Sequence, residues 1–431
     1  MNKSAGSKKL NRTLGLSSLI FYGVGVIIGA GVYSIIGAAA EAAGSGLWLS
    51  FVLAALVALL SALSYAELAT SFPRAGAEYI YLGKALPKLP SASFIVGILV
   101  VITGATTCAT VSLAFAGYFE TLIGWPIPIV AGALLILCAL INIIGIRESS
   151  WVTIGCTIIE IVGLILIIGF GVTTPTFGEA LLQPLHLGVL SGAGLIFFVY
   201  TGFEGLANLS EESKKPETHL PLALLLSLGI TTILYILVGL SVLALSSPEA
   251  LGASSSPLTT ALAQRSPSFA SALSWIALFS TANTALIVML VGSRLLYGMG
   301  VGGDLPKAFT KTLPSRKSPW VATVVVLLAA LSLIPLGKVA VAGSLSSLIT
   351  LTAFISVNLA LIILRFKSPQ LKRPFRVPLS IKKFPILPAL AIPACIFMAS
   401  RFEWIVYAAG AGAFALSATA YIVLKQLKLK K

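Results

Sequence analysis

Apolar runs long enough to cross a lipid bilayer recur from one end of this 431-residue chain to the other. A helix needs about 20 apolar residues to span the hydrocarbon core, and the sequence holds about twelve such runs. They lie near residues 14–41, 47–70, 92–121, 127–144, 150–172, 188–209, 220–246, 268–299, 319–336, 340–364, 384–400 and 403–424. Because the runs are continuously apolar, they predict helices and not the alternating strands of a transmembrane barrel. We therefore expect an all-α integral membrane protein.

The basic residues give these spans an orientation. Cytoplasmic loops attract Lys and Arg, and with the N-terminus inside, all but three of the 29 basic residues fall on the inner side. The exceptions are Arg265, Lys338 and Arg401. Both termini are thus expected in the cytoplasm and the chain in the cell membrane. The net charge of +15 is spread over loops beside the membrane, which favours contact with anionic lipid over binding of nucleic acid.

The first span, with the stretch VIIGAGVYS, contains glycines where a helix should be most regular. Each glycine costs a helix interior up to about 1 kcal/mol relative to alanine. Gly29, Ala30 and Gly31 lie halfway along the span, where unpaired backbone groups are tolerated only beside a cavity or a ligand. Close helix packing through the Gly25 and Gly29 pair is the other interpretation, and the glycines alone favour neither.

The sixth span, FFVYTGFEGLANLSEE, repeats this feature. Gly202 and Gly205 flank Glu204, a carboxylate deep in an apolar segment, where an unpaired charge costs roughly 3 kcal/mol or more. Two interrupted spans at corresponding positions predict two inverted five-helix repeats, 14–172 and 188–364, followed by two further helices in 384–424. We expect the whole chain, 1–431, to form one transporter unit.

An interrupted helix exposes amides that bind an anion and carbonyls that bind a cation. An α-amino acid carries both charges on one carbon. Two facing interruptions therefore suit a zwitterionic head group and leave room for its side chain between the helices.

Four stretches in order resemble a known family. IIGAGVYS, SYAELATSFPRAGAEYIY, FVYTGFEGLANLSEESKKPETHLPLAL and SRLLYGMGVGGDLPKAF are similar to the motifs of amino acid permeases in the amino acid–polyamine–organocation superfamily. The resemblance covers nearly the whole chain. It implies alternating access by a five-plus-five repeat, with the substrate held between the first, third, sixth and eighth spans.

By position, the resemblance assigns roles at the substrate site. It implies that the amides of Gly29, Ala30 and Gly31 bind the carboxylate, and it makes Phe198 an aromatic gate, for which a core aromatic is the alternative. Carbonyls near Val26, Ile27, Val199 and Thr201 would bind the ammonium, with Gly202 beside them. Thr103, Thr106 and Thr107 are candidates for the pocket wall, although membrane threonines commonly bond back to their own helix.

Buried acidic residues are the candidates for coupling to an ion. Glu204 is interpreted either as a protonation site or as a hydrogen-bonded strut for the broken helix. Glu160 stands where many relatives in the family carry a lysine, so the lysine mechanism does not transfer. Glu160 has three functional interpretations, a proton site, a sodium ligand with Ser280 and Thr281, or a selector of cationic substrates, and one structural interpretation, a protonated side chain bonded to a neighbouring helix.

A further carboxylate, Glu67, lies at the inner end of the second span. We expect it to pack near Arg74 in a structural role.

The leading functional hypothesis is a proton-coupled secondary transporter of neutral amino acids. A transporter of cationic amino acids, polyamines or small amines, or an exchanger, is the alternative, and a channel or sensor is disfavoured. The chain lacks the HExxH, GxSxG and Walker patterns of enzymes, and His186 and His219 are isolated. We expect no cofactor and no bound metal; the coupling ion, proton or sodium, and the oligomeric state stay open.

Overall fold

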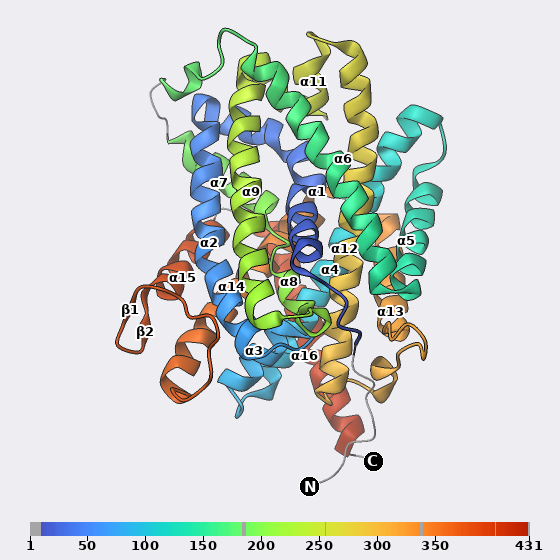
Figure 1. The fold of residues 1–431 in the computed structure, drawn as a ribbon. Helices are drawn as coiled ribbons and strands as arrows, with labels where there is room; N and C mark the ends of the chain where they lie inside the picture. The colour runs from blue at the N-terminus through green and yellow to red at the C-terminus, as the bar shows by residue number, and fades with distance from the viewer. Residues whose placement is uncertain (1–9, 183–186, 255, 337–338, 401, 430–431) are drawn as a thin grey trace.

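The computed structural model describes residues 10–182, 187–254, 256–336, 339–400 and 402–429, and these are almost entirely helical (Figure 1). The helices are α1 (Leu16–Ala43), α2 (Leu47–Ser71), α3 (Ala77–Ala85), α4 (Pro90–Ile123), α5 (Ile127–Ile144), α6 (Ile146–Val172), α7 (Gly188–Phe197), α8 (Gly205–Asn208), α9 (Pro216–Leu245), α10 (Pro248–Gly252), α11 (Pro257–Ala263), α12 (Pro267–Val301), α13 (Trp320–Leu333), α14 (Val339–Lys367), α15 (Ile386–Ala399) and α16 (Trp404–Leu429). Two short strands, β1 (Ser380–Ile381) and β2 (Phe384–Pro385), pair antiparallel with Ser380 opposite Pro385.

The predicted spans correspond to helices of the structure. Among the described residues, ten helical stretches are long and apolar enough to cross a membrane, and two shorter apolar helices, Trp320–Leu333 and Ile386–Ala399, complete the predicted set. The predicted fold class, an all-α membrane protein of about twelve helices, is therefore confirmed. The short helices α3, α10 and α11 lie outside the predicted spans.

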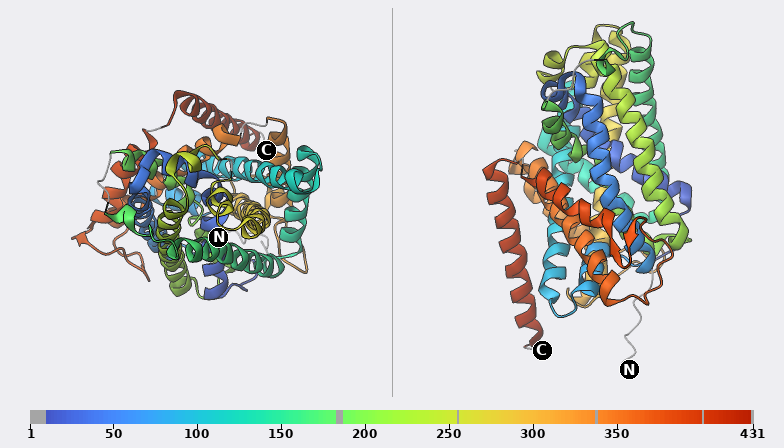
Figure 2. Two further views of the ribbon diagram at one scale, coloured as in Figure 1. Left: turned by 90° about the horizontal axis from the view of Figure 1, so that it is seen from above. Right: turned by 90° about the vertical axis from the view of Figure 1, so that its left-hand side faces the viewer.

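The long helices form one bundle around α12. This helix is the most buried of the ten candidate membrane spans among the described residues. α16 lies at the edge of the bundle in both views of Figure 2 and contacts α4 and α14. The first described residues and the end of α16 lie at the same end of the bundle (Figure 1).

The first span is interrupted where its glycines predict. Gly29 has φ −11° and ψ −158°, outside the helical range, so α1 consists of two half-helices. Gly25 belongs to the close-packing interpretation instead, because a Cβ there would lie 2.2 Å from Thr157 Oγ1 of α6 and 2.8 Å from Asn283 Nδ2 of α12. The span is therefore interrupted at Gly29 and closely packed at Gly25.

The sixth span is interrupted as well. α7 ends at Phe197, a 3-10 turn follows at Phe198–Tyr200, and the chain resumes as α8 at Gly205. Gly202 has φ +111°, a backbone conformation that side chains with a Cβ rarely adopt. Its amide donates to Glu204 Oε2 at 2.8 Å, so the helical ladder stops there.

Buried ion pairs at two carboxylates, Glu212 and Glu67, tie distant segments together. Arg294 of α12 binds both carboxylate oxygens of Glu212, which follows α8, at 3.1 Å each. The predicted neighbour of Glu67, Arg74, is wrong: Glu67 pairs with Arg365 at the end of α14 and with Arg373 in the loop beyond it, 3.0 Å away. The reason is topological, because α14 packs on α2 and brings its basic end to this carboxylate.

Candidate functional site

The two helix breaks pack directly against each other. A Cβ on Gly202 would lie 2.7 Å from Cγ2 of Val26, one turn before the break in α1. A Cβ on Gly31 would lie 3.4 Å from Cα of Val199 in the 3-10 turn. The small residues on both sides thus let two irregular backbones approach closely in the middle of the bundle.

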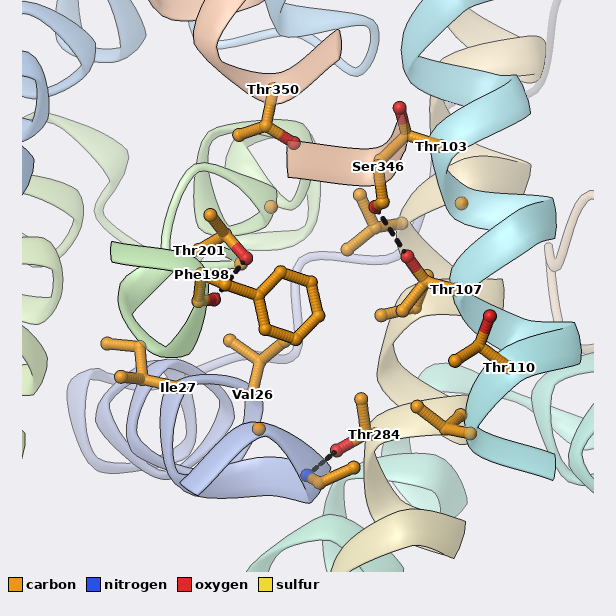
Figure 3. A pocket seen from close by; sticks show the side chains of 18 of the residues that line it. Val26, Ile27, Thr103, Thr107, Thr110, Phe198, Thr201, Thr284, Ser346 and Thr350 are labelled. Atoms are coloured by element: carbon orange, nitrogen blue, oxygen red, sulfur yellow. Dashed lines mark hydrogen bonds between the residues drawn. The ribbon is translucent and has the colours of Figure 1, made fainter. Parts of the chain in front are cut away.

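Beside these breaks lies a cavity of about 180 Å³. Its wall is formed by α1, α3, α4, the break between α7 and α8, α12 and α14 (Figure 3). The volume is below the ~300–1,000 Å³ of sites for drug-sized ligands, so the cavity fits a small molecule. Among the described residues no cluster of three or more His, Cys, Asp or Glu is arranged to hold a metal ion.

Most residues predicted for the site lie in this wall. They are Val26, Ile27, Ala30, Gly31, Thr103, Thr107, Phe198, Val199, Thr201, Gly202, Glu204 and Thr281. Three predicted residues, Gly29, Glu160 and Ser280, do not line it. Gly29 instead packs on α12, where a Cβ would lie 2.1 Å from Thr284 Oγ1. The structure therefore gathers the predicted substrate site and separates Glu160 from it.

Backbone groups at the α1 break already have protein partners. The Ala30 amide donates to Thr284 Oγ1 at 3.2 Å, and the Ile27 carbonyl accepts from the Tyr235 hydroxyl at 2.6 Å. A ligand carboxylate at the Ala30 amide would compete with Thr284. Sequence reasoning missed this threonine, since α12 places it beside α1 only through tertiary packing.

Phe198 projects into the middle of the cavity, between Val26 and the Thr107–Ser346 pair (Figure 3). A Cβ on Gly31 would lie 3.7 Å from its ring. The ring thus stands beside the breaks, where an aromatic gate would contact a ligand, and it is only partly buried.

Hydroxyl side chains not predicted from the sequence complete the wall. They are Thr110 of α4, Thr284 of α12, and Ser346 and Thr350 of α14. Helical spacing carries a signal for Thr110, which follows Thr103 and Thr107 on one face of α4. Thr106 points away and bonds back to the Ile102 carbonyl at 3.0 Å.

The charged residues of the described wall are Glu204 and Glu78. Glu204 spans its own break through the bond to the Gly202 amide, as the strut interpretation requires. Glu78, on α3, was not predicted; it accepts from the Tyr65 hydroxyl and from Asn208 Nδ2, both at 3.1 Å. α3 lies outside the candidate spans, and burial raises the pKa of Glu78 above its ordinary value.

Glu160 lies in a second buried polar cluster. Asn283 Nδ2 donates to Glu160 Oε1 at 3.0 Å and to Thr157 Oγ1 at 3.2 Å. Glu160 Oε2 and Ser280 Oγ have no hydrogen-bond partner within the described structure. Tyr33 stands between this cluster and the cavity, since it lines the cavity and its hydroxyl donates to the Glu160 carbonyl at 3.4 Å.

The fold and the cavity define a class: a multi-pass membrane protein with a small cavity beside two broken helices. Comparison with known proteins agrees, because residues 14–423 match the sequence profile of a family described as "Amino acid permease". The chain belongs to the amino acid permease family, a family of transporters and not of enzymes.

The relatives of this chain are named for different substrates. The chain is 31% identical to the branched-chain amino acid permease BcaP of Bacillus subtilis, over 93% of this chain and 90% of that one. It is 30% identical to the methylthioribose transporter of the same organism, over 92% and 90%. It is 34% identical to the chloroplastic cationic amino acid transporter 9 of Arabidopsis thaliana, over 73% and 59%.

Proposed function

We propose that this chain is a secondary active transporter that moves neutral amino acids across the cytoplasmic membrane by alternating access, coupled to protons. The observation that carries the proposal is the meeting of two helix breaks at one cavity. Broken helices near the middle of a bundle are where such transporters bind charged head groups. Membership of the permease family supports an amino acid as the substrate.

The proposed architecture is two inverted repeats, 14–172 and 188–364, with the helices of 384–424 outside them. It is supported by the breaks in α1 and between α7 and α8, the first and sixth spans. The proposed topology, with both termini in the cytoplasm, is supported by the shared end of the bundle at which residue 10 and the end of α16 lie (Figure 1) and by the basic loops.

A neutral substrate is supported by the electrostatics of the wall. Both oxygens of Glu78 accept hydrogen bonds from the protein, and one oxygen of Glu204 does so. The rest of the described wall consists of apolar, glycine and hydroxyl or amide groups. A cationic substrate is the second candidate, because the Glu204 carboxylate lines the cavity and several relatives are named for cationic amino acids.

Proton coupling is supported by Glu160. A fully buried carboxylate with one unpaired oxygen is costly to keep ionised, so a proton or a bound cation would stabilise it. Thr281, proposed as a sodium ligand, donates its hydroxyl hydrogen to the Ala277 carbonyl at 2.9 Å. Its oxygen lone pairs stay available to a cation, so sodium is the alternative coupling ion.

The test is uptake of a labelled amino acid panel into proteoliposomes under a proton gradient and, separately, a sodium gradient. We expect proton-driven uptake of neutral amino acids by the wild type and loss of the proton dependence in Glu160→Gln. Unchanged proton dependence in the variant would make Glu160 structural and Glu204 the coupling candidate. Transport of amines or cationic amino acids alone would promote the second candidate.

A further inference from the structure

Three hydroxyl side chains form a polar face on the cavity wall, at α4 and α14 (Figure 3). We call Thr107 of α4 with Ser346 and Thr350 of α14 the hydroxyl face. Thr107 Oγ1 and Ser346 Oγ lie 2.9 Å apart, so these two bridge α4 and α14. Thr350 is 5% exposed and lines the same cavity, and its hydroxyl has no hydrogen-bond partner in the described structure.

This arrangement differs from that of ordinary threonines in membrane helices, which bond back to a carbonyl of the preceding turn. Thr106, Thr281 and Thr284 do so in this chain. Thr107 and Thr350 do not, which leaves their hydroxyls turned to the cavity side of the helices. A hydroxyl with unused hydrogen-bonding capacity can bond to a ligand, which stabilises the bound state.

Two further hydroxyl groups on the cavity wall can form hydrogen bonds that the protein does not supply. Thr103 and Thr110 lie on the cavity side of α4, four residues before and three after Thr107. Both hydroxyl oxygens are buried and lack a partner within the described residues. The α4 and α14 side of the wall therefore holds more hydrogen-bonding groups than the protein itself pairs.

We propose that the hydroxyl face recognises the substrate's side chain, and that the transported amino acids carry a hydroxyl or carboxamide on a short neutral side chain, as serine, threonine, asparagine and glutamine do. The inference rests on the proposed function, which holds the head group at the breaks. The Phe198 ring lies between Val26 and the Thr107–Ser346 pair (Figure 3), so a substrate side chain that extends from the breaks past this ring reaches the hydroxyl face.

The chemistry excludes other side chains. Hydroxyl and carboxamide groups both donate and accept, which matches hydroxyls with free donors and acceptors. An aliphatic side chain would leave the hydroxyl face unpaired. A cationic one would meet no carboxylate there, since the charged residues of the described wall lie on α3 and at the helix break.

Threonine and valine have nearly the same shape and differ in the hydroxyl, so their competition isolates this interaction. We expect wild-type protein in proteoliposomes to take up threonine in preference to valine by at least about tenfold, since a site built to bond a substrate hydroxyl rejects an analogue without it. Thr350→Val and Ser346→Ala should each narrow that ratio by about tenfold, the effect of one hydrogen bond. Thr106→Val, which alters a back-bonded threonine outside the wall, should leave the ratio unchanged.

A second measurement does not depend on turnover. Threonine should raise the melting temperature of purified wild type in detergent, and less so that of Thr350→Val. A preference for valine or leucine in the wild type, or an unaltered ratio in both variants, overturns this inference and leaves the proposed function standing. Uptake of no amino acid overturns the proposed function and this inference with it.

Discussion

Gly202 occupies the tightest contact between the two helix breaks. Its φ of +111° disfavours any Cβ, and an added Cβ would lie 2.7 Å from Val26. Each effect costs roughly 1–3 kcal/mol. We therefore predict that Gly202→Ala lowers the melting temperature and the uptake rate together, because it forces apart the two segments that form the cavity.

The matched control is Gly194→Ala on α7, where a Cβ meets no atom within 4 Å. Alanine there should be neutral or slightly stabilising, because it improves helix propensity. If Gly202→Ala behaved like Gly194→Ala in thermal unfolding and in uptake, the close contact of the breaks would not matter for the fold or the site.

Glu78 should make stability depend on pH. Burial raises its pKa in the folded protein above the ordinary value near 4.5. The folded state then binds the proton more tightly, so the stabilisation from this group is full below the unfolded pKa and is lost as pH rises through the folded pKa. We predict that Glu78→Gln flattens the curve of melting temperature against pH above about 4.5.

Glu120→Gln, at the exposed end of α4, provides the control for that experiment. Its pH curve should follow the wild type. A Glu78→Gln curve that also followed the wild type would show that Glu78 does not titrate in this range.

Residue types and the family resemblance predicted part of the cavity wall. Thr103 and Thr107 were candidates because they lie on the third span, which the family resemblance places beside the substrate, and both line the cavity. Ser346 and Thr350 lie on α14, but nothing local marks α14 as a neighbour of α4. Only one interpretation of Glu160, as a selector of cationic substrates, required it at the pocket. Glu160 does not line the cavity, and Tyr33, which does, bonds to its backbone carbonyl.

Among the helices, the two broken ones were predicted because glycine destabilises the interior of a membrane-spanning helix. Irregular backbone is costly in lipid and is tolerated only beside a cavity or in close packing. Glycines in the middle of a span therefore indicated such a place, and the backbone is irregular at Gly29 and Gly202. The helices α3, α10 and α11 were not predicted, since they are too short to give a span-length apolar run.

The Arg294–Glu212 pair fastens the segment after α8 to α12. Arg294 is fully buried and Glu212 is 2% exposed, so removing one partner leaves a buried charge. We predict that Arg294→Met costs about 3–5 kcal/mol of stability. The double variant Arg294→Met with Glu212→Gln should lose less, because no charge remains unpaired.

Thermal unfolding of the two single variants, the double variant and wild type forms a double-mutant cycle for this pair. Additive losses would mean that the two side chains do not interact. The exposed pair Arg316–Glu148, with side chains 52% and 38% exposed, offers a comparison that should contribute at most about 1 kcal/mol.

For the whole molecule, local hydropathy predicted the membrane spans. It did not predict which distant residues pack together. Glu67 shows the difference: its partner Arg365 lies 298 residues away in sequence, and no periodicity links the two. The helix count and the basic loops bear on how the chain crosses the membrane, whereas side-chain partners depend on which helices pack together.

The proposed function requires that substrate is bound and moved through the cavity at the two helix breaks. The most direct test is uptake of labelled amino acids by Gly31→Phe, whose added ring starts in ordinary contact with Val199 and Phe198 and fills the cavity. Gly194→Phe, on an open face of α7, is the control. We predict a membrane-inserted, folded Gly31→Phe protein whose uptake falls at least about 100-fold, beyond the loss of one or two hydrogen bonds, and a control with near-wild-type uptake. Full uptake by Gly31→Phe would contradict the account.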